Sequence, residues 1–189
     1  MSAYTTDEEF TGLDYTASGF PKGEYENCTF RNCMFSGTDL SGVIFLECEF
    51  DGCDLSNAII KNTSIKDVRF RNCKLLGLRF DQCASLLLAF SFEQCVLNFS
   101  SFYKLKLKGT AFNGCQLQEV EFVEADLSQA SFHDCDLTRA IFEQSILEGA
   151  DFRTAWNFSI DPEMNRIRRA RFSATGILGL LDKHDIVVE

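Results

Sequence analysis

The stretch from Phe92 to Phe152 reads FEQCV LNFSS FYKLK LKGTA FNGCQ LQEVE FVEAD LSQAS FHDCD LTRAI FEQSI LEGAD F. Every fifth residue in it is apolar, and phenylalanine alternates with leucine without exception. The same period runs from Tyr25 to Phe80. Phenylalanine also returns every twenty residues, at positions 10, 30, 50 and 70 and then, after a shift of two, at 92, 112, 132, 152 and 172. One repeating unit therefore accounts for most of the chain.

Neither regular secondary structure explains a period of five. In an α-helix, a step of five residues rotates the apolar side chain by about 140° each time and distributes it around the helix. A continuous strand would send alternate large residues to opposite faces, because five is odd. A chain that turns a corner every five residues keeps them all inside. Four such units make one square coil of twenty residues, and equivalent residues of successive coils lie about 4.8 Å apart.

Smaller side chains stand two residues before the large ones, as in the triplets TDL at 38–40, CDL at 53–55 and ADL at 125–127. These quintets resemble the pentapeptide-repeat family over roughly residues 10–158. The resemblance implies an all-β fold, namely a right-handed quadrilateral β-helix of seven to eight coils. We therefore expect an N-terminal segment at 1–9, the β-helix at 10–158, and a C-terminal cap at 159–189.

Two extra residues interrupt the period after Phe80, and we place them as a bulge within residues 81–86. With this insertion the columns on both sides join, so that Phe102 continues the column of Phe80. Leu87 then takes the inward place between Ile65 and Leu107. The insertion is predicted to be a corner bulge within one solenoid and not a domain boundary.

All nine cysteines occupy the small inward position, at 28, 33, 48, 53, 73, 83, 95, 115 and 135. We interpret them as free thiols that pack as small apolar side chains. Six of them form one column, and neighbours about 4.8 Å apart lie within the range that a disulfide can bridge. A linear column cannot surround zinc tetrahedrally, so we predict no metal site.

The composition favours one water-soluble domain without catalytic function. The chain has 189 residues, 46% of them hydrophobic, and no apolar run approaches the 18 or so residues that a membrane span needs. We expect a cytoplasmic protein with no signal peptide and no membrane contact. The two histidines, His133 and His184, lack a nucleophile at a motif spacing, and no phosphate-binding loop is present. The sequence predicts neither an enzyme nor a cofactor.

Negative charge is concentrated in residues 111–155, where nine acids face two arginines for a net charge of −7. The acids are Glu119, Glu121, Glu124, Asp126, Asp134, Asp136, Glu143, Glu148 and Asp151. One interpretation is a polar surface that keeps the rod soluble. The other is an acidic face whose regular rows of carboxylates occupy a partner's basic DNA groove. The net charge of −10 argues against direct nucleic-acid binding, although residues 61–79 contain six bases and one acid.

Within the family, the sequence resembles the Qnr quinolone-resistance subgroup in its Phe/Leu inward positions, acidic coils and non-repeat C-terminal segment. The resemblance implies a dimeric DNA mimic that binds DNA gyrase or topoisomerase IV. Many Qnr members carry longer loops that matter for quinolone protection. This chain has only the two-residue insertion, so the resemblance does not extend to quinolone protection. The alternative is a structural or protein-interaction scaffold with an unknown cytoplasmic partner.

The C-terminal segment predicts a cap for the open end of the solenoid. Ser173 is a plausible N-cap of a short helix with apolar residues on one face, and residues 186–188 (IVV) indicate a short strand. By analogy with the family, the same residues also join two rods end to end as a homodimer. The predicted cap and dimer residues are Ile177, Leu178, Leu180, Leu181, Ile186 and Val188.

Overall fold

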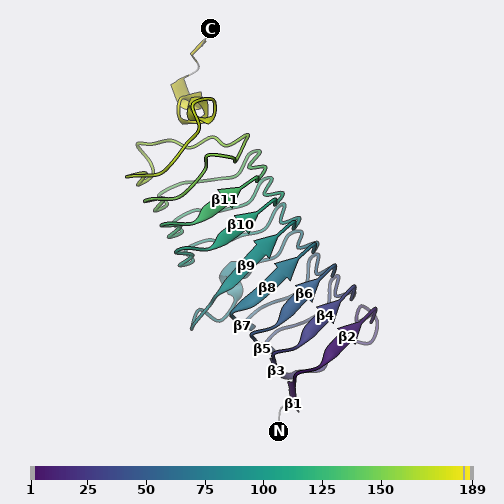
Figure 1. The fold of residues 1–189 in the computed structure, drawn as a ribbon. Coiled ribbons are helices and arrows are strands. Elements are labelled where there is room, and N and C mark those ends of the chain that lie inside the picture. The colour runs from purple at the N-terminus through teal and green to yellow at the C-terminus, as the bar shows by residue number, and fades with distance from the viewer. Residues whose placement is uncertain (1–2, 185, 188–189) are drawn as a thin grey trace.

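Short parallel strands, stacked one coil above another, form the body of an elongated molecule (Figure 1). The structure is a computed structural model that describes residues 3–184 and 186–187. It is an all-β parallel solenoid, which confirms the fold class predicted from the five-residue period.

Two parallel sheets lie on different sides of this solenoid. The four-stranded sheet contains β1 (Ala3–Thr6), β3 (Gly23–Glu26), β5 (Ile44–Leu46) and β7 (Ser64–Lys66). The seven-stranded sheet contains β2 (Glu9–Thr11), β4 (Thr29–Arg31), β6 (Glu49–Asp51), β8 (Val68–Arg71), β9 (Phe90–Glu93), β10 (Ala111–Asn113) and β11 (Ser131–His133). Three 3-10 helices complete the elements, η1 (Phe80–Gln82), η2 (Gly176–Leu180) and η3 (Asp182–His184).

Each coil has four walls, which we name by their inward residues. Wall A contains the seven-stranded sheet and the column that begins with Phe10, and wall B the column that begins with Tyr15. Wall C contains the column that begins with Phe20, and wall D the four-stranded sheet with Tyr25. The chain follows the order D, A, B, C in every coil. Five-residue spacing therefore places consecutive quintets on consecutive walls.

The phenylalanine column of wall A extends through the whole rod. Rings twenty or twenty-two residues apart stack from Phe10 to Phe172, with centroids 4.7–5.4 Å apart and interplanar angles of 1–18°. Such offset stacks add to the free energy that burying each ring already provides. The pairing of Phe70 with Phe92 carries the register across the two-residue shift, as predicted.

The small inward residues do more than fill space. The Cys53 thiol donates to the carbonyl oxygen of Phe30 at 3.2 Å, and the Thr63 hydroxyl donates to that of Leu40 at 2.8 Å. Ser145 repeats this contact with a carbonyl of the preceding coil. Cysteine, serine and threonine thus share one role, because each is a small side chain with a donor that reaches a buried carbonyl. All nine cysteines are buried and free, as the repeat predicted.

Most corners of the solenoid are made by a residue in the left-handed backbone conformation. Twenty non-glycine residues of the described chain have a positive φ, together with nine glycines. Asparagine, other polar residues and glycine tolerate this conformation best. This requirement explains why the residue two positions after each large inward side chain is rarely apolar.

The insertion lies slightly later than predicted, and Leu87 is not in the core. The Ala84 N–H donates to the Thr63 carbonyl at 2.9 Å, and the Ala89 N–H donates to that of Ile65 at 3.1 Å, so residues 85–88 bulge between these two anchors. Leu87 is 70% exposed. Phe90 is buried instead, because its ring packs against Phe80 and Phe92 and fills the space that the prediction assigned to Leu87.

The backbone ladder extends beyond the predicted limits of 10–158. At the N-terminus, β1 pairs with β3, and at the other end Asp151 pairs with Arg171. Backbone hydrogen bonds require no large apolar residue, so coils form at both ends where the sequence period has faded. In the last coil Asn165 takes the small inward position and donates to the Phe142 carbonyl.

Candidate functional site

The nine predicted acids of residues 111–155 do not share one face. Backbone bridges place Glu121 on wall C beside Ser101, and Asp126 on wall D beside Lys106. Asp136 lies on wall B, and Asp151 lies on wall A. The single acidic face expected from the sequence is therefore wrong in geometry, because acids a few residues apart in the chain lie on different walls.

Five of the nine acids gather on two adjoining walls. Wall C and its corner carry Glu121, Glu124 and Glu143, and wall D carries Asp126 and Glu148. Successive coils bring these rows together, since the Glu124 N–H donates to the Glu143 carbonyl at 2.8 Å. We call this group the C–D acidic edge.

Several of the nine carboxylates already have counter-ions. Glu119 pairs with Arg139 at 3.3 Å, Glu124 with Lys104 at 3.4 Å, Glu148 with Arg166 at 2.6 Å and Asp151 with Arg153 at 2.7 Å. Such exposed pairs stabilise the fold by about 0–1 kcal/mol each. They also reduce the negative field that a partner would meet.

The other carboxylates have no arginine or lysine partner among the described residues. Ser101 donates to Glu121 at 2.5 Å, and Ser128 donates to Asp126 at 2.5 Å. Glu143 has no side-chain hydrogen bond in the described part of the chain. These three residues belong to the C–D acidic edge, whereas Asp134 lies at the corner after wall A and Asp136 lies on wall B. The edge therefore holds three of the five carboxylates that have no arginine or lysine partner among the described residues.

Asp136 and Asp151 remain ionised for different reasons. Burial raises the pKa of Asp136, but hydrogen bonds from Thr138, Gln118 and Asn157 outweigh it, and the net shift is downward. The Arg153 guanidinium lowers the pKa of Asp151 by hydrogen bonding. Both carboxylates therefore contribute negative charge at neutral pH.

The C-terminal segment closes the end of the solenoid with η2 instead of an α-helix. The Ser173 hydroxyl accepts a hydrogen bond from the Gly176 N–H at 2.9 Å, but the N-cap position of η2 is Thr175 and not the predicted Ser173. A Cβ at Gly179 would overlap the carbonyl oxygen and ring of Phe158, so only glycine allows this close approach. Phe158 in turn contacts Phe152 and Phe172 and covers the core.

The predicted cap and dimer residues divide into two groups. Leu180 packs against the core, whereas Ile177, Leu178 and Leu181 are 36–49% exposed. Ile186 and Val187 are exposed and are not in a strand, so that part of the prediction is wrong. Their β-branched side chains favour a strand only where a neighbouring strand offers hydrogen bonds. Val188 lies outside the described residues.

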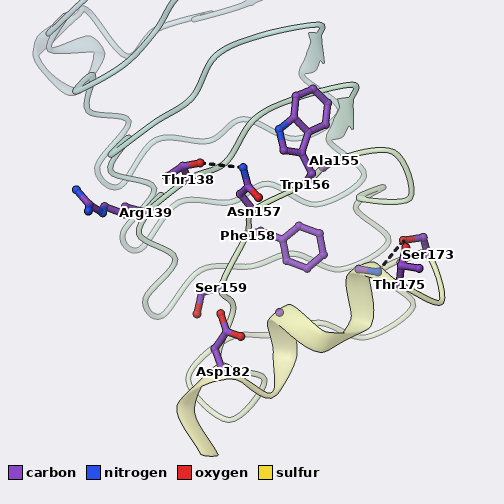
Figure 2. A pocket seen from close by; sticks show the side chains of 12 residues that line it. Thr138, Arg139, Ala155, Trp156, Asn157, Phe158, Ser159, Ser173, Thr175 and Asp182 are labelled. Carbon is purple, nitrogen blue, oxygen red and sulfur yellow. Dashed lines mark hydrogen bonds between the residues drawn. The ribbon is translucent and has the colours of Figure 1, made fainter. Parts of the chain in front are cut away.

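A hollow of about 830 Å³ is lined by residues of the last coils and of η2. Figure 2 shows Phe158 pointing toward η2, while Trp156 and Arg139 line the wall formed by the coil. The Asn157 amide donates to the Thr138 hydroxyl at 3.1 Å and to Asp136 at 3.0 Å. The sequence analysis missed this hollow because the capping segment, not the repeat, creates it.

Metal-ligating side chains do not gather in the described part of the chain. His133 is exposed, with Nδ1 2.9 Å from the Thr154 hydroxyl and Nε2 3.3 Å from Asp134. Within residues 3–184 and 186–187, no group of three or more His, Cys, Asp or Glu side chains could hold a metal ion. None of the helices in this described part has the length and apolarity to cross a membrane.

The repeat architecture agrees with a known family. The family model for the pentapeptide repeat region matches residues 24–91 and 86–155. The chain belongs to the pentapeptide-repeat family. No curated protein sequence matches it.

Two solved structures were among those similar to this chain. A trypsin-treated form of QnrB1, a plasmid-mediated fluoroquinolone resistance protein, has a TM-score of 0.51 and 21% sequence identity, over 99% of this chain and 100% of that chain. HetL, involved in heterocyst differentiation regulation in the cyanobacterium Nostoc sp. Strain PCC 7120, has a TM-score of 0.32 and 13% identity, over 89% of this chain and 86% of its own. At 21% identity, the similarity to QnrB1 concerns the fold alone.

Proposed function

We propose that this pentapeptide-repeat protein is a non-catalytic, cytoplasmic protein-binding rod whose C–D acidic edge occupies a basic, DNA-binding surface of its partner. DNA gyrase or topoisomerase IV is the first candidate partner, because the sequence resembles the Qnr subgroup. The observation that carries the proposal is that Glu121, Asp126 and Glu143 lie on adjoining walls and form no ion pair with an arginine or lysine among the described residues.

The ladder gives these carboxylates a regular spacing. Equivalent positions repeat about every 4.8 Å along the rod, and phosphates repeat every 3.4 Å along each DNA strand. A groove lined with lysine and arginine side chains can therefore meet successive charges of either molecule. The backbone hydrogen bonds hold the rows in place, so little ordering entropy is lost on binding.

The test measures binding of the chain to purified gyrase at low and moderate salt, with and without competing duplex DNA. The proposal predicts competition with DNA and weaker binding as salt rises, because screening reduces attraction between charges. The variant Glu121→Lys, Glu124→Lys, Asp126→Lys should lose binding while keeping its β circular dichroism.

A matched control carries the same charge change elsewhere, as Glu8→Lys, Glu24→Lys, Glu47→Lys. This control should retain most of the binding. Equal losses in the two triple variants would show that only net charge matters and would remove the C–D acidic edge as the site. Absence of gyrase and topoisomerase IV binding would favour the alternative, a scaffold for another cytoplasmic partner.

We further propose that two rods pair end to end through the exposed apolar residues of the cap. Ile177, Leu178 and Leu181 lie on the outer side of the structure that closes the core, with Ile186 beyond them in the chain. Light scattering in solution should give twice the chain mass of 21.4 kDa. The variant Ile177→Asp, Leu181→Asp should give the monomer mass, and a monomeric unmodified protein would refute the pairing.

A further inference from the structure

The bulge at residues 85–88 places apolar side chains where the rest of the rod places polar ones. Of the twenty non-glycine residues with positive φ in the described chain, eighteen are polar or charged. The two exceptions are Leu87, with φ 58°, and Phe99, with φ 64°. A bulky apolar residue is unfavourable in this conformation, and strained positions of this kind are concentrated at functional sites.

Of the three leucines in the bulge, Leu88 packs against the core, whereas Leu86 and Leu87 have no role there. Leu86 and Leu87 are 73% and 70% exposed, and Phe90 fills the interior at this level. The hydrogen bond of Ala84 to Thr63, just before β7, and that of Ala89 to Ile65 on β7 fix the two ends of the bulge, and residues 85–87 between them project from wall D. Polar residues at positions 86 and 87 would be equally compatible with the fold.

The surface around the bulge is basic. Lys66 lies on β7, Lys106 and Lys108 lie on wall D of the next coil, and Lys61 lies on wall C. In the described structure none of these four lysines forms an ion pair, unlike Lys104, which pairs with Glu124. The nearest acids in wall D are Asp67 at its corner, Glu47 at the same corner of the preceding coil, and Asp126, which lies beside Lys106.

This basic surface belongs to a wider alternation of charge along the rod. Residues 61–108 contain nine bases and three acids, a net charge of +6. Two of these acids, Asp81 and Glu93, pair with arginines. Residues 1–60 contain eleven acids and two bases, and residues 111–155 have a net charge of −7. A positive belt thus lies between two negative regions.

We propose that the bulge and its four lysines form a second docking surface, for an acidic protein segment that carries apolar side chains. The lysines attract the acidic groups, and Leu86 and Leu87 supply the apolar contact that concentrates binding energy in an interface. This surface adjoins the C–D acidic edge, since Lys106 lies beside Asp126, but it has the opposite charge and is changed by different substitutions.

Charge and shape favour a short protein segment over a larger polyanion. A DNA duplex or an anionic bilayer would extend over the acidic regions on both sides of the belt and be repelled there. Single-stranded nucleic acid binds through stacking on aromatic rings, which leucine does not offer. A short acidic segment can stay within the belt.

The test uses a fluorescein-labelled peptide in which glutamate alternates with leucine, and a counterpart in which lysine replaces glutamate. Fluorescence anisotropy at low salt should show binding of the acidic peptide only. The variant Leu86→Asn, Leu87→Asn should weaken that binding at least about tenfold. Its melting temperature should stay the same or rise, because asparagine accepts the left-handed conformation at position 87.

Two further variants complete the experiment. Lys66→Gln, Lys106→Gln, Lys108→Gln should weaken binding and reduce its dependence on salt. Ile141→Asn, an equally simple change at a 43% exposed apolar residue on wall C, should leave binding unchanged. The proposal is overturned if the acidic peptide does not bind, if binding survives the leucine variant, or if oligo-dT or anionic vesicles bind through the same residues with equal affinity.

Discussion

Phe112 offers the most direct test of how the solenoid is held together. It is fully buried at the middle of the wall A column. Its ring stacks on Phe92 at 5.3 Å and on Phe132 at 5.1 Å, and meets Phe102 and Phe122 edge to face at 5.8 and 5.9 Å. The variant Phe112→Ala removes all four ring contacts at once.

The expected loss lies at the upper end of the range for such substitutions. Replacing a buried phenylalanine by alanine lowers the free energy of unfolding by about 3–5 kcal/mol, depending on how far the site can collapse. Here the backbone of β10 is held in register between β9 and β11. Neighbouring coils therefore cannot close the cavity, and the lost ring pairs were worth about 0.5–1.5 kcal/mol each. We expect a loss of about 5 kcal/mol.

The measurement is urea unfolding followed by circular dichroism and by the fluorescence of Trp156, the single tryptophan. Circular dichroism reports the whole ladder, whereas Trp156 reports the last coils, and repeat proteins can unfold in parts. The control Gln116→Ala changes an exposed residue four positions away and should cost less than about 0.5 kcal/mol. Similar losses at the two positions would refute the assignment of inward and outward residues.

Three other outcomes follow from the described contacts. Phe99→Asn should raise the free energy of unfolding by about 1 kcal/mol, because asparagine tolerates the positive φ that strains phenylalanine, and a decrease would contradict this view of the corners. The native thiols should resist alkylation until the chain unfolds, since burial raises the pKa of Cys48 and of Cys83 to about 12, and rapid labelling without denaturant would disprove it. Acid should destabilise the rod as pH falls from about 4 toward 2. Hydrogen bonds from Ser41 and then Lys22 lower the pKa of Asp39 to about 2, whereas the pKa in the unfolded chain is about 3.9. The stabilisation by the Asp39 carboxylate is therefore present above pH 4 and is lost as the folded carboxylate is protonated. Asp39→Asn should flatten that part of the pH profile of urea stability, and an unchanged slope would exclude Asp39 as the cause.

The interior of the rod was predictable from the sequence because each position in a repeat has one environment. A five-residue period demands a corner every five residues, and a twenty-residue period demands that like residues stack. The inward cysteines and the register between Phe70 and Phe92 followed from this arithmetic. The thiol donors to buried carbonyls did not, since a hydrogen bond between coils has no sequence signature of its own.

The candidate sites were less predictable because the outside of a solenoid obeys no repeat. The list of nine acids was read along the chain, whereas their grouping depends on which wall each quintet occupies and on which base lies one coil away. Leu87 fits the five-residue count as an inward residue, yet Phe90 competes for the same space and takes it. Periodicity alone could not show which of Leu87 and Phe90 is buried.

By itself the sequence determined the family, the four walls and most of the core, with Phe90 in place of Leu87 as the exception, because the burial of one large and one small side chain per quintet repeats in every coil. Only the tertiary structure decided which carboxylates keep their charge uncompensated, where the leucine bulge projects, and how the cap closes the last coil. Those features depend on contacts between residues about twenty positions apart, and a local pattern contains no information about which of several competing neighbours will be closest in space.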